Sequence, residues 1–149
     1  MCIRDRATVD KYDFNTWNVP YKPGRLEAIG YKNGREVIRT WVDTTSEPVS
    51  IQLIPDRKSL AGDGQDAMPV MVRVVDKKGR LVPNASHLIE FEVLGEGELI
   101  GVGNGNPNSH ESDKATVRRL HHGLAQAIVQ SQENTTGYVT LHARSKGLK

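Results

Sequence analysis

The sequence predicts an all-β protein, in which an immunoglobulin-like antiparallel β-sandwich is preceded by the last strands of a second such sandwich. Three observations lead to this fold class. Apolar and polar residues alternate along most of the chain, as they do in strands that bury one face. Turn-forming Gly, Pro, Asn and Asp residues recur about every 8–12 positions, which is typical of sandwiches with short strands. The best helical candidate, residues 113–120, is short and contains β-branched Thr and Val, so no helix is expected.

Residues 7–45 are predicted to be the C-terminal part of a truncated immunoglobulin-like domain. A strand is expected at 14–19. A hairpin is expected at 25–31 and 35–43, because the intervening Asn33-Gly34 pair accepts the positive φ angles of a tight turn. Three strands are about half of a sandwich, so the rest of this domain is expected upstream of the sequence. The apolar face left without its opposing sheet is expected to consist of Leu26, Ala28, Ile38 and Trp41.

A polar linker at residues 44–48 marks the expected domain boundary. Residues 46–149 are predicted to form a complete immunoglobulin-like C-terminal domain, with the strand number of a constant-type immunoglobulin fold. Phe91 alternates with two Glu residues, so its side chain is expected in the core. The strands of this domain are predicted at 48–54, 67–75, 87–94, 97–102, 114–119, 123–131 and 136–144.

The first six residues are predicted to be a sequencing-adapter artefact, because Met-Cys-Ile-Arg-Asp-Arg resembles the translation of a library adapter. The native gene is then expected to continue upstream of Ala7. Cys2 is the only cysteine, so an internal disulfide, a Cys…Trp…Cys signature and a cysteine-based zinc site are excluded.

Composition excludes further classes of function. The chain has 20 Lys and Arg residues against 18 Asp and Glu residues, a net charge of +2, which is too small to steer the protein towards nucleic acid. The basic pair Arg118-Arg119 has no aromatic residues interleaved with it, as single-stranded nucleic acid would require. No apolar run approaches the ~18–20 residues of a membrane span.

Two interpretations apply to the polar loops. Their side chains carry oxygen ligands that suit Ca²⁺, but the same residue types are those that turns require. The spacing of a calcium hand is absent, so turn formation is favoured, and no metal or other cofactor is expected. The residues concerned are Asp63, Asp66, Asp76, Asn104, Asn106, Asn108 and Glu111.

Two further clusters have a chemical and a structural interpretation. His110-Glu111 between two serines could act in acid–base chemistry and His121-His122 could bind a metal, but solvated turns are favoured for both. Aromatic side chains in the N-terminal segment could stack on sugars, although packing is the commoner use of such rings. These aromatic residues are Trp17, Tyr21, Tyr31 and Trp41. We therefore assign no catalytic, cofactor-binding or metal-binding residue.

Two stretches of the chain resemble a known family. The first, residues 17–28 followed by 30–34, resembles the last strands of the immunoglobulin-like domain that follows the catalytic barrel in bacterial glycoside hydrolase family 2 enzymes, which are usually named β-galactosidases. The second stretch resembles the C-terminal immunoglobulin-like domain of the same enzymes, with Asn106 where the family often has Asp. It comprises residues 61–66, 74–79, 82–85, 91–93, 101–107, 110–112 and 128–131.

The resemblance implies a parent enzyme that hydrolyses O-glycosyl bonds in carbohydrate metabolism with two Glu residues on a barrel. That barrel would lie upstream of Ala7, so this chain is expected to be a non-catalytic, inactive accessory domain. Its expected partner is the upstream barrel, with polysaccharide as a second candidate, and its expected location is periplasmic or secreted. Two alternatives stay open, namely a cell-surface, adhesin-type immunoglobulin-like module and a carbohydrate-binding module.

Overall fold

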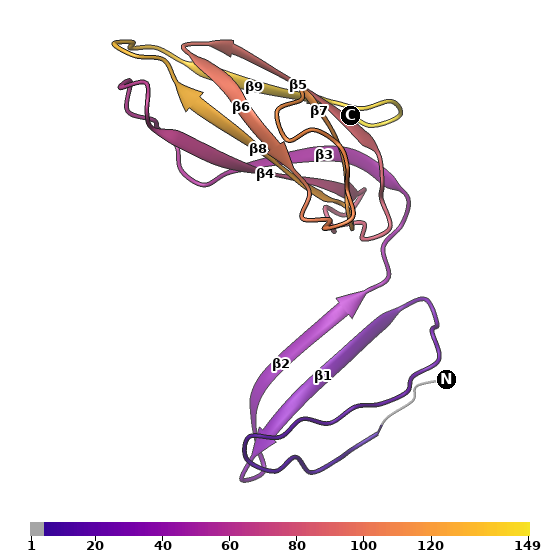
Figure 1. The fold of residues 1–149 in the computed structure, drawn as a ribbon. Coiled ribbons are helices and arrows are strands. Elements are labelled where there is room, and N and C mark those ends of the chain that lie inside the picture. Colours follow the sequence, from indigo (N-terminus) through magenta and orange to yellow (C-terminus); the bar gives the residue numbers. More distant parts are fainter. Residues whose placement is uncertain (1–4) are drawn as a thin grey trace. The chain divides into compact units, whose positions relative to one another are not determined.

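A computed structural model describes residues 5–149, and every regular element in that range is a strand (Figure 1). The described part of the chain therefore holds no helix that could cross a membrane. Residues 1–4 of the predicted adapter segment, Cys2 among them, lie outside the described residues. The chain divides into two compact units, with the boundary between Thr44 and Thr45.

The first unit contains one antiparallel hairpin. Strand β1 (Arg25–Lys32) pairs with β2 (Arg35–Asp43). The connecting residues Asn33 and Gly34 have φ angles of 52° and 76°, which is the conformation that a two-residue hairpin turn requires. The predicted hairpin is confirmed.

Two expectations for this unit are wrong. Residues 14–19 are not a strand, because no segment within residues 5–149 pairs with them through the ladder of hydrogen bonds that a strand needs. Leu26, Ala28 and Ile38 share one face of the hairpin, but Trp41 lies on the opposite face, where it pairs with Glu27. The reason is that side chains alternate along a strand, and positions 38 and 41 are an odd number of residues apart.

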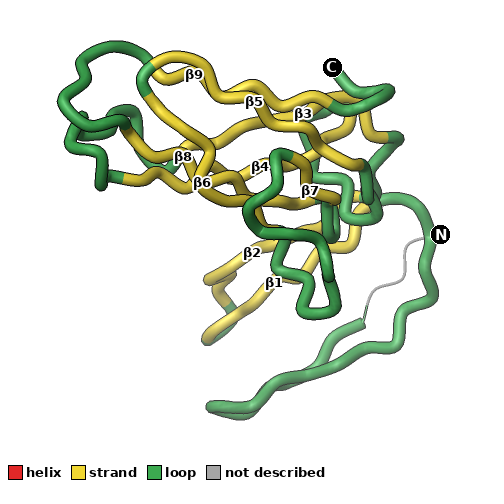
Figure 2. The backbone as a smooth tube through the Cα atoms, turned by 45° about the horizontal axis from the view of Figure 1, so that its top comes forward, coloured by secondary structure: helices red, strands yellow, loops and turns green. Residues whose placement is uncertain are grey.

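The second unit is a sandwich of two antiparallel sheets (Figures 1 and 2). One sheet has four strands in the order β3-β4-β8-β6, and the other has three strands in the order β7-β5-β9. This arrangement confirms the predicted all-β sandwich. The strands are β3 (Pro48–Pro55), β4 (Ala67–Asp76), β5 (Leu88–Gly95), β6 (Gly97–Gly103), β7 (Val117–Arg119), β8 (Leu124–Ser131) and β9 (Val139–Arg144).

The core lies between the two sheets. Val72 and Val74 of β4 and Ala127 of β8 are fully shielded from solvent, as is Ile89 of β5. Phe91 is 5% exposed and belongs to the same cluster, so its predicted burial is confirmed. Alternate residues of each strand supply these contacts, which is why the polar–apolar pattern located the strands.

Three strands are shorter than predicted. The strand expected at 114–119 begins at Val117, because Ser112 closes a turn by accepting hydrogen bonds from the backbone N–H groups of Lys114 and Ala115. The strand expected at 123–131 begins at Leu124 because Gly123 has a φ of 77°. The strand expected at 136–144 is limited to Val139–Arg144.

Candidate functional site

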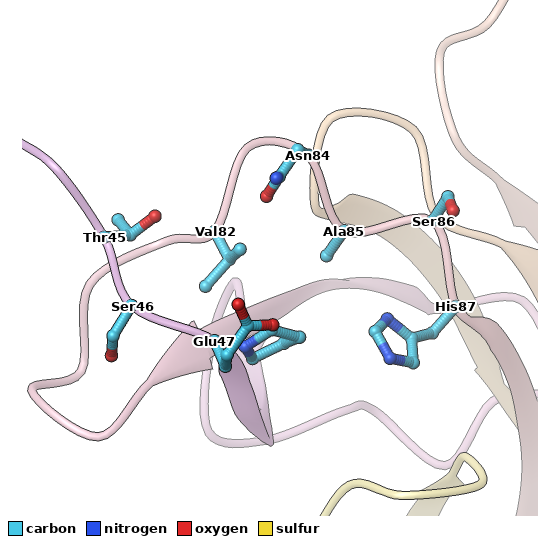
Figure 3. A pocket seen from close by; sticks show the side chains of 9 residues that line it. Thr45, Ser46, Glu47, Val82, Asn84, Ala85, Ser86 and His87 are labelled. Atoms are coloured by element: carbon cyan, nitrogen blue, oxygen red, sulfur yellow. The ribbon is translucent and has the colours of Figure 1, made fainter.

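A polar hollow of about 290 Å³ opens in the second unit where this unit begins (Figure 3). One wall is the segment that leads into β3, and the other is the loop between β4 and β5. Most of the lining residues are polar and carry hydroxyl, amide, carboxylate or imidazole groups, whereas Val82 and Ala85 are buried. The lining residues are Thr45, Ser46, Glu47, Pro48, Val82, Asn84, Ala85, Ser86 and His87.

Asp76, at the end of β4, holds the first wall. Its Oδ2 atom accepts a hydrogen bond of 3.0 Å from the backbone N–H of Ser46. The same carboxylate accepts bonds from Nε and Nη2 of Arg80, at 2.9 and 2.6 Å, and from the backbone N–H groups of Lys78 and Arg80. The Arg80 guanidinium, aided by the backbone N–H donors, holds the pKa of this buried carboxyl well below its usual range.

The second wall is fixed by backbone hydrogen bonds. The N–H of Val82 donates to the carbonyl of Val74 at 3.0 Å, and the N–H of Ala85 donates to Val82 at 3.1 Å. Further along, the carbonyl of His87 accepts a 2.9 Å bond from the N–H of Leu120. Hydrogen bonds to the end of β4 therefore hold both walls of the hollow in place.

Two side chains distinguish the hollow chemically. The Nδ1 atom of His87 is buried, and no described residue forms a hydrogen bond with it. The imidazole extends from its loop on the side where Glu47 lies (Figure 3). Glu47 is exposed and is the only carboxylate in the lining.

A second hollow, of about 640 Å³, lies over β6 and β8 and is bordered by the loop that follows β6. Arg118 supports that loop with a side chain that is 5% exposed. Its Nη1 atom donates 2.9 Å hydrogen bonds to the Glu111 carbonyl and to Asp113 Oδ1, and Nη2 donates a 3.3 Å bond to Asn104. This guanidinium is therefore engaged by the loop itself.

Several of the acidic and amide residues considered for calcium are used by turns. Oδ1 of Asp63 accepts the backbone N–H groups of Gln65 and Asp66, and these bonds lower the pKa of Asp63. Asn104 and Asn106 each accept the backbone N–H two residues further on. Among residues 5–149, no group of three or more His, Cys, Asp or Glu side chains is placed to hold a metal ion.

The remaining candidate clusters differ in how far local contacts engage them. Glu111 approaches both Arg118 and Arg119, and it accepts the Arg119 backbone N–H at 3.1 Å. The rings of His121 and His122 contact each other, with centroids 4.1 Å apart. Among the aromatic candidates, the Arg25 guanidinium lies 5.1 Å over the Trp41 ring. Trp17, Tyr21 and Tyr31 are exposed.

Sequence reasoning missed Glu47 and His87. Glu47 stood in a segment that was assigned to a linker, and no local pattern singles out His87. The two residues are brought together by contacts between distant segments, which a local pattern does not encode.

Comparison with known proteins decides the family. Residues 51–149 match the family model described as glycoside hydrolase family 2 C-terminal domain 5. The chain belongs to glycoside hydrolase family 2. A second model, described as a domain of unknown function (DUF4982), matches residues 4–38 of this family 2 chain.

Curated relatives agree with the family 2 assignment. The β-galactosidase BoGH2A of Bacteroides ovatus is 38% identical over 133 residues, which cover 89% of this chain and 16% of that protein. A putative β-glucuronidase of Formosa agariphila is 30% identical over 116 residues, which cover 77% of this chain and 11% of that protein. The resemblance noted in the sequence is thereby confirmed.

Solved structures give the same result. A family 2 member from Bacteroides cellulosilyticus DSM 14838 has a TM-score of 0.86 and 33% identity, over 89% of this chain and 18% of that chain. A β-glycosidase from Bacteroides vulgatus has a TM-score of 0.82 and 31% identity, over 89% of this chain and 17% of that chain. This family 2 chain therefore spans less than a fifth of the length of each of these relatives.

Proposed function

We propose that the chain is the C-terminal accessory region of a β-galactosidase-like family 2 enzyme, which hydrolyses O-glycosyl bonds on a catalytic barrel elsewhere in the protein. The sandwich packs against that barrel and supplies no catalytic group. The observation that carries this proposal is the match of residues 51–149 to a C-terminal family 2 domain. The glycosidase names of the relatives favour this role over that of a cell-surface module.

The chemistry of the two hollows supports a non-catalytic role. Glycoside hydrolysis generally requires a pair of carboxyl groups that flank the scissile bond. The first hollow is lined by one carboxylate, Glu47, and the second by one, Asp113. Asp113 is ion-paired with Arg118 at 2.9 Å, so it is oriented by the loop rather than towards a substrate.

Domain exchange with a relative tests the accessory role. The B. ovatus β-galactosidase is truncated before the region that aligns with residues 45–149 of this chain, and these residues are grafted in its place. We expect the truncated enzyme to lose thermal stability and activity, and the graft to restore both, because the sandwich covers the barrel surface that truncation exposes. The isolated chain should not turn over chromogenic galactosides or glucuronides.

A matched control distinguishes rescue by the folded sandwich from rescue by the added length of chain alone. Val72 is fully buried in the sandwich core, so Val72→Asp unfolds the graft without altering its surface. The variant graft should behave like the truncated enzyme. Equal rescue by both grafts, an unaffected truncated enzyme, or turnover that copurifies with the isolated chain would each contradict the proposed function.

A further inference from the structure

The two outer faces of the sandwich differ in chemistry. An antiparallel sheet that covers a core with one face usually turns polar side chains outward on the other. The three-stranded sheet follows this rule, and Nη2 of Arg144 lies 3.2 Å from Oε2 of Glu92 in an ion pair between two of its strands. The charged residues that this sheet turns outward are Glu90, Glu92, Arg119 and Arg144.

The four-stranded sheet departs from this rule, because an apolar stripe crosses its outer face. Ile54 of β3 lies opposite Met71 of β4, which is 48% exposed. Pro69, on the same face of β4 as Met71, lies opposite Ile128 of β8. Ile100 of β6 lines the second hollow together with Ile128. The apolar stripe therefore consists of Ile54, Pro69, Met71, Ile100 and Ile128.

The packing of the sandwich does not account for the apolar stripe. Val70 and Val72, the neighbours of Met71 in β4, are buried in the core, so Met71 faces away from it. Apolar side chains that are exposed singly are ordinary, whereas a contiguous apolar patch marks an interaction surface. The stripe joins residues of all four strands, so it is a patch of this kind.

The size of the apolar stripe favours a partner that belongs to the same polypeptide. A stable contact between separate proteins involves about 20–30 residues a side, whereas the stripe contains five. A covalently attached partner needs less contact, because attachment raises its effective concentration. The relatives contain such a partner, since this chain aligns with 16% of the B. ovatus β-galactosidase and with 18% of the B. cellulosilyticus structure.

The chemistry of the apolar stripe disfavours other occupants. A polysaccharide presents hydroxyl groups, which aliphatic side chains cannot hydrogen-bond. A strongly charged partner would meet Arg73 and Glu98, which lie on the same face and have opposite charges. We propose that the sandwich docks on the catalytic barrel of its parent enzyme through the apolar stripe. This inference rests on the proposed accessory role and adds which face of the sandwich makes the contact.

Photo-cross-linking tests which part of the enzyme covers the apolar stripe. The B. ovatus β-galactosidase carrying the graft of residues 45–149 is produced with photo-methionine, a diazirine analogue that keeps the shape of Met and inserts into the groups it touches. We expect cross-links from Met71 to peptides of the catalytic barrel. Leu94 is also 48% exposed, but on the charged outer face. The same probe in Leu94→Met should therefore give no cross-link from position 94 to the barrel.

Matched charge substitutions test whether the contact matters. Met71→Glu places a charge in the middle of the apolar stripe, where burial without a partner is costly. The Met71→Glu graft should lose the thermal stability and the activity that the unaltered graft restores, whereas the Leu94→Glu graft should retain them. Both side chains point away from the core. Both variants of the full chain should therefore keep the urea midpoint of the second unit.

Failure of the docking face and failure of the accessory role give different results. Cross-links from Met71 to the barrel without rescue by the graft would contradict the accessory role and support the docking face. Rescue without such cross-links, or equal rescue by the Met71→Glu graft, would overturn the docking face alone. Absence of both rescue and cross-links would overturn both proposals. Cross-links through Met71 between copies of the isolated full chain would assign the stripe to a second copy and overturn the docking face.

Discussion

Ser46 and Asp76 lie 30 residues apart in the sequence, and the backbone N–H of Ser46 donates a 3.0 Å hydrogen bond to Oδ2 of Asp76. The same carboxylate binds the guanidinium of Arg80. One buried acidic side chain thus joins the segment that enters β3 to the turn that leaves β4. The polar hollow lies beside this junction, because one wall is the first segment and the other is the loop 82–87 that continues from the turn.

Replacement of Asp76 should loosen both segments. In Asp76→Asn, the amide has one acceptor oxygen in place of two, and its NH₂ group faces the donors of Arg80 and Ser46. We expect a lower urea midpoint for the second unit and weaker amide protection at Ser46. Asp56→Asn is the matched control, because Asp56 is 61% exposed in its ion pair with Arg57, and it should change the midpoint little. Equal midpoints for the two variants would show that Asp76 does not anchor the unit.

The lowered pKa of Asp76 predicts a loss of stability in acid. The folded state holds this pKa below the value of an unfolded Asp, about 3.9. The stability contributed by the ionised carboxyl is therefore fully present above that value, and it is lost as the pH falls towards the folded pKa. Urea unfolding from pH 7 to pH 2 should show a decline that is smaller in Asp76→Asn. An identical decline in the variant would assign the acid sensitivity to other carboxyls.

Phe91 should be a sensitive position of the three-stranded sheet. Its side chain is 5% exposed within the core cluster. Truncation of a buried Phe to Ala typically costs about 3–5 kcal/mol, because it removes apolar contacts and leaves a cavity. Phe91→Leu should cost about 1.5 kcal/mol or less, since it retains most of the volume. A loss below about 1 kcal/mol for Phe91→Ala in a denaturant titration would contradict its central role.

Alternation along a strand is a local property, and together with the turn signals it predicted the presence of every strand of the second unit and the burial of Phe91. Pairing is not local. Residues 14–19 have strand-like composition but pair with no other described segment. Trp41 was assigned to the wrong face because its position relative to Ile38 was misjudged. The ends of β7 and β9 are set by turns. The hydrogen bonds of these turns join residues that are not adjacent in the sequence, and alternation does not reveal them.

The hollow could not be predicted for a related reason. Glu47 and His87 are 40 positions apart, and each is unremarkable in its local sequence. Their proximity follows from hydrogen bonds made by Asp76 and Val74 at the end of β4. A search of the sequence for polar or ionisable side chains detects residues that are adjacent in the chain, such as His121-His122. It does not detect residues that only folding brings together.

Two glycines of similar backbone conformation should respond differently to substitution. Gly95 and Gly79 have φ angles of 90° and 75°. A Cβ atom on Gly95 would overlap the carbonyl oxygen of Tyr138, whereas one on Gly79 would enter open space. Gly79→Ala should cost about 1–2 kcal/mol, the cost of a left-handed conformation. Gly95→Ala should cost clearly more, because the backbone beside Tyr138 must also move. Similar urea midpoints for the two variants would show that the close approach is relieved without cost.

The two units should differ in amide hydrogen exchange. No side chain of the hairpin 25–43 is buried by the described residues, and Leu26 and Ile38 are 62% and 64% exposed. A two-stranded sheet without a covered apolar face is marginally stable in water. Its ion pairs, Arg25 with Asp43 among them, lie at the surface, where solvent screens them.

The sandwich, in contrast, has its own core between two sheets. We therefore expect slow exchange in β4 and β8, and exchange within the first time points in β1 and β2, measured on the full chain. The fragment 45–149 should reproduce the slow exchange of β4 and β8, because their protection comes from contacts within the second unit. Protection of β1 and β2 equal to that of β4, in a sample shown to be monomeric, would mean that the first unit is stable through contacts of its own, and the contrast between the two units would be wrong.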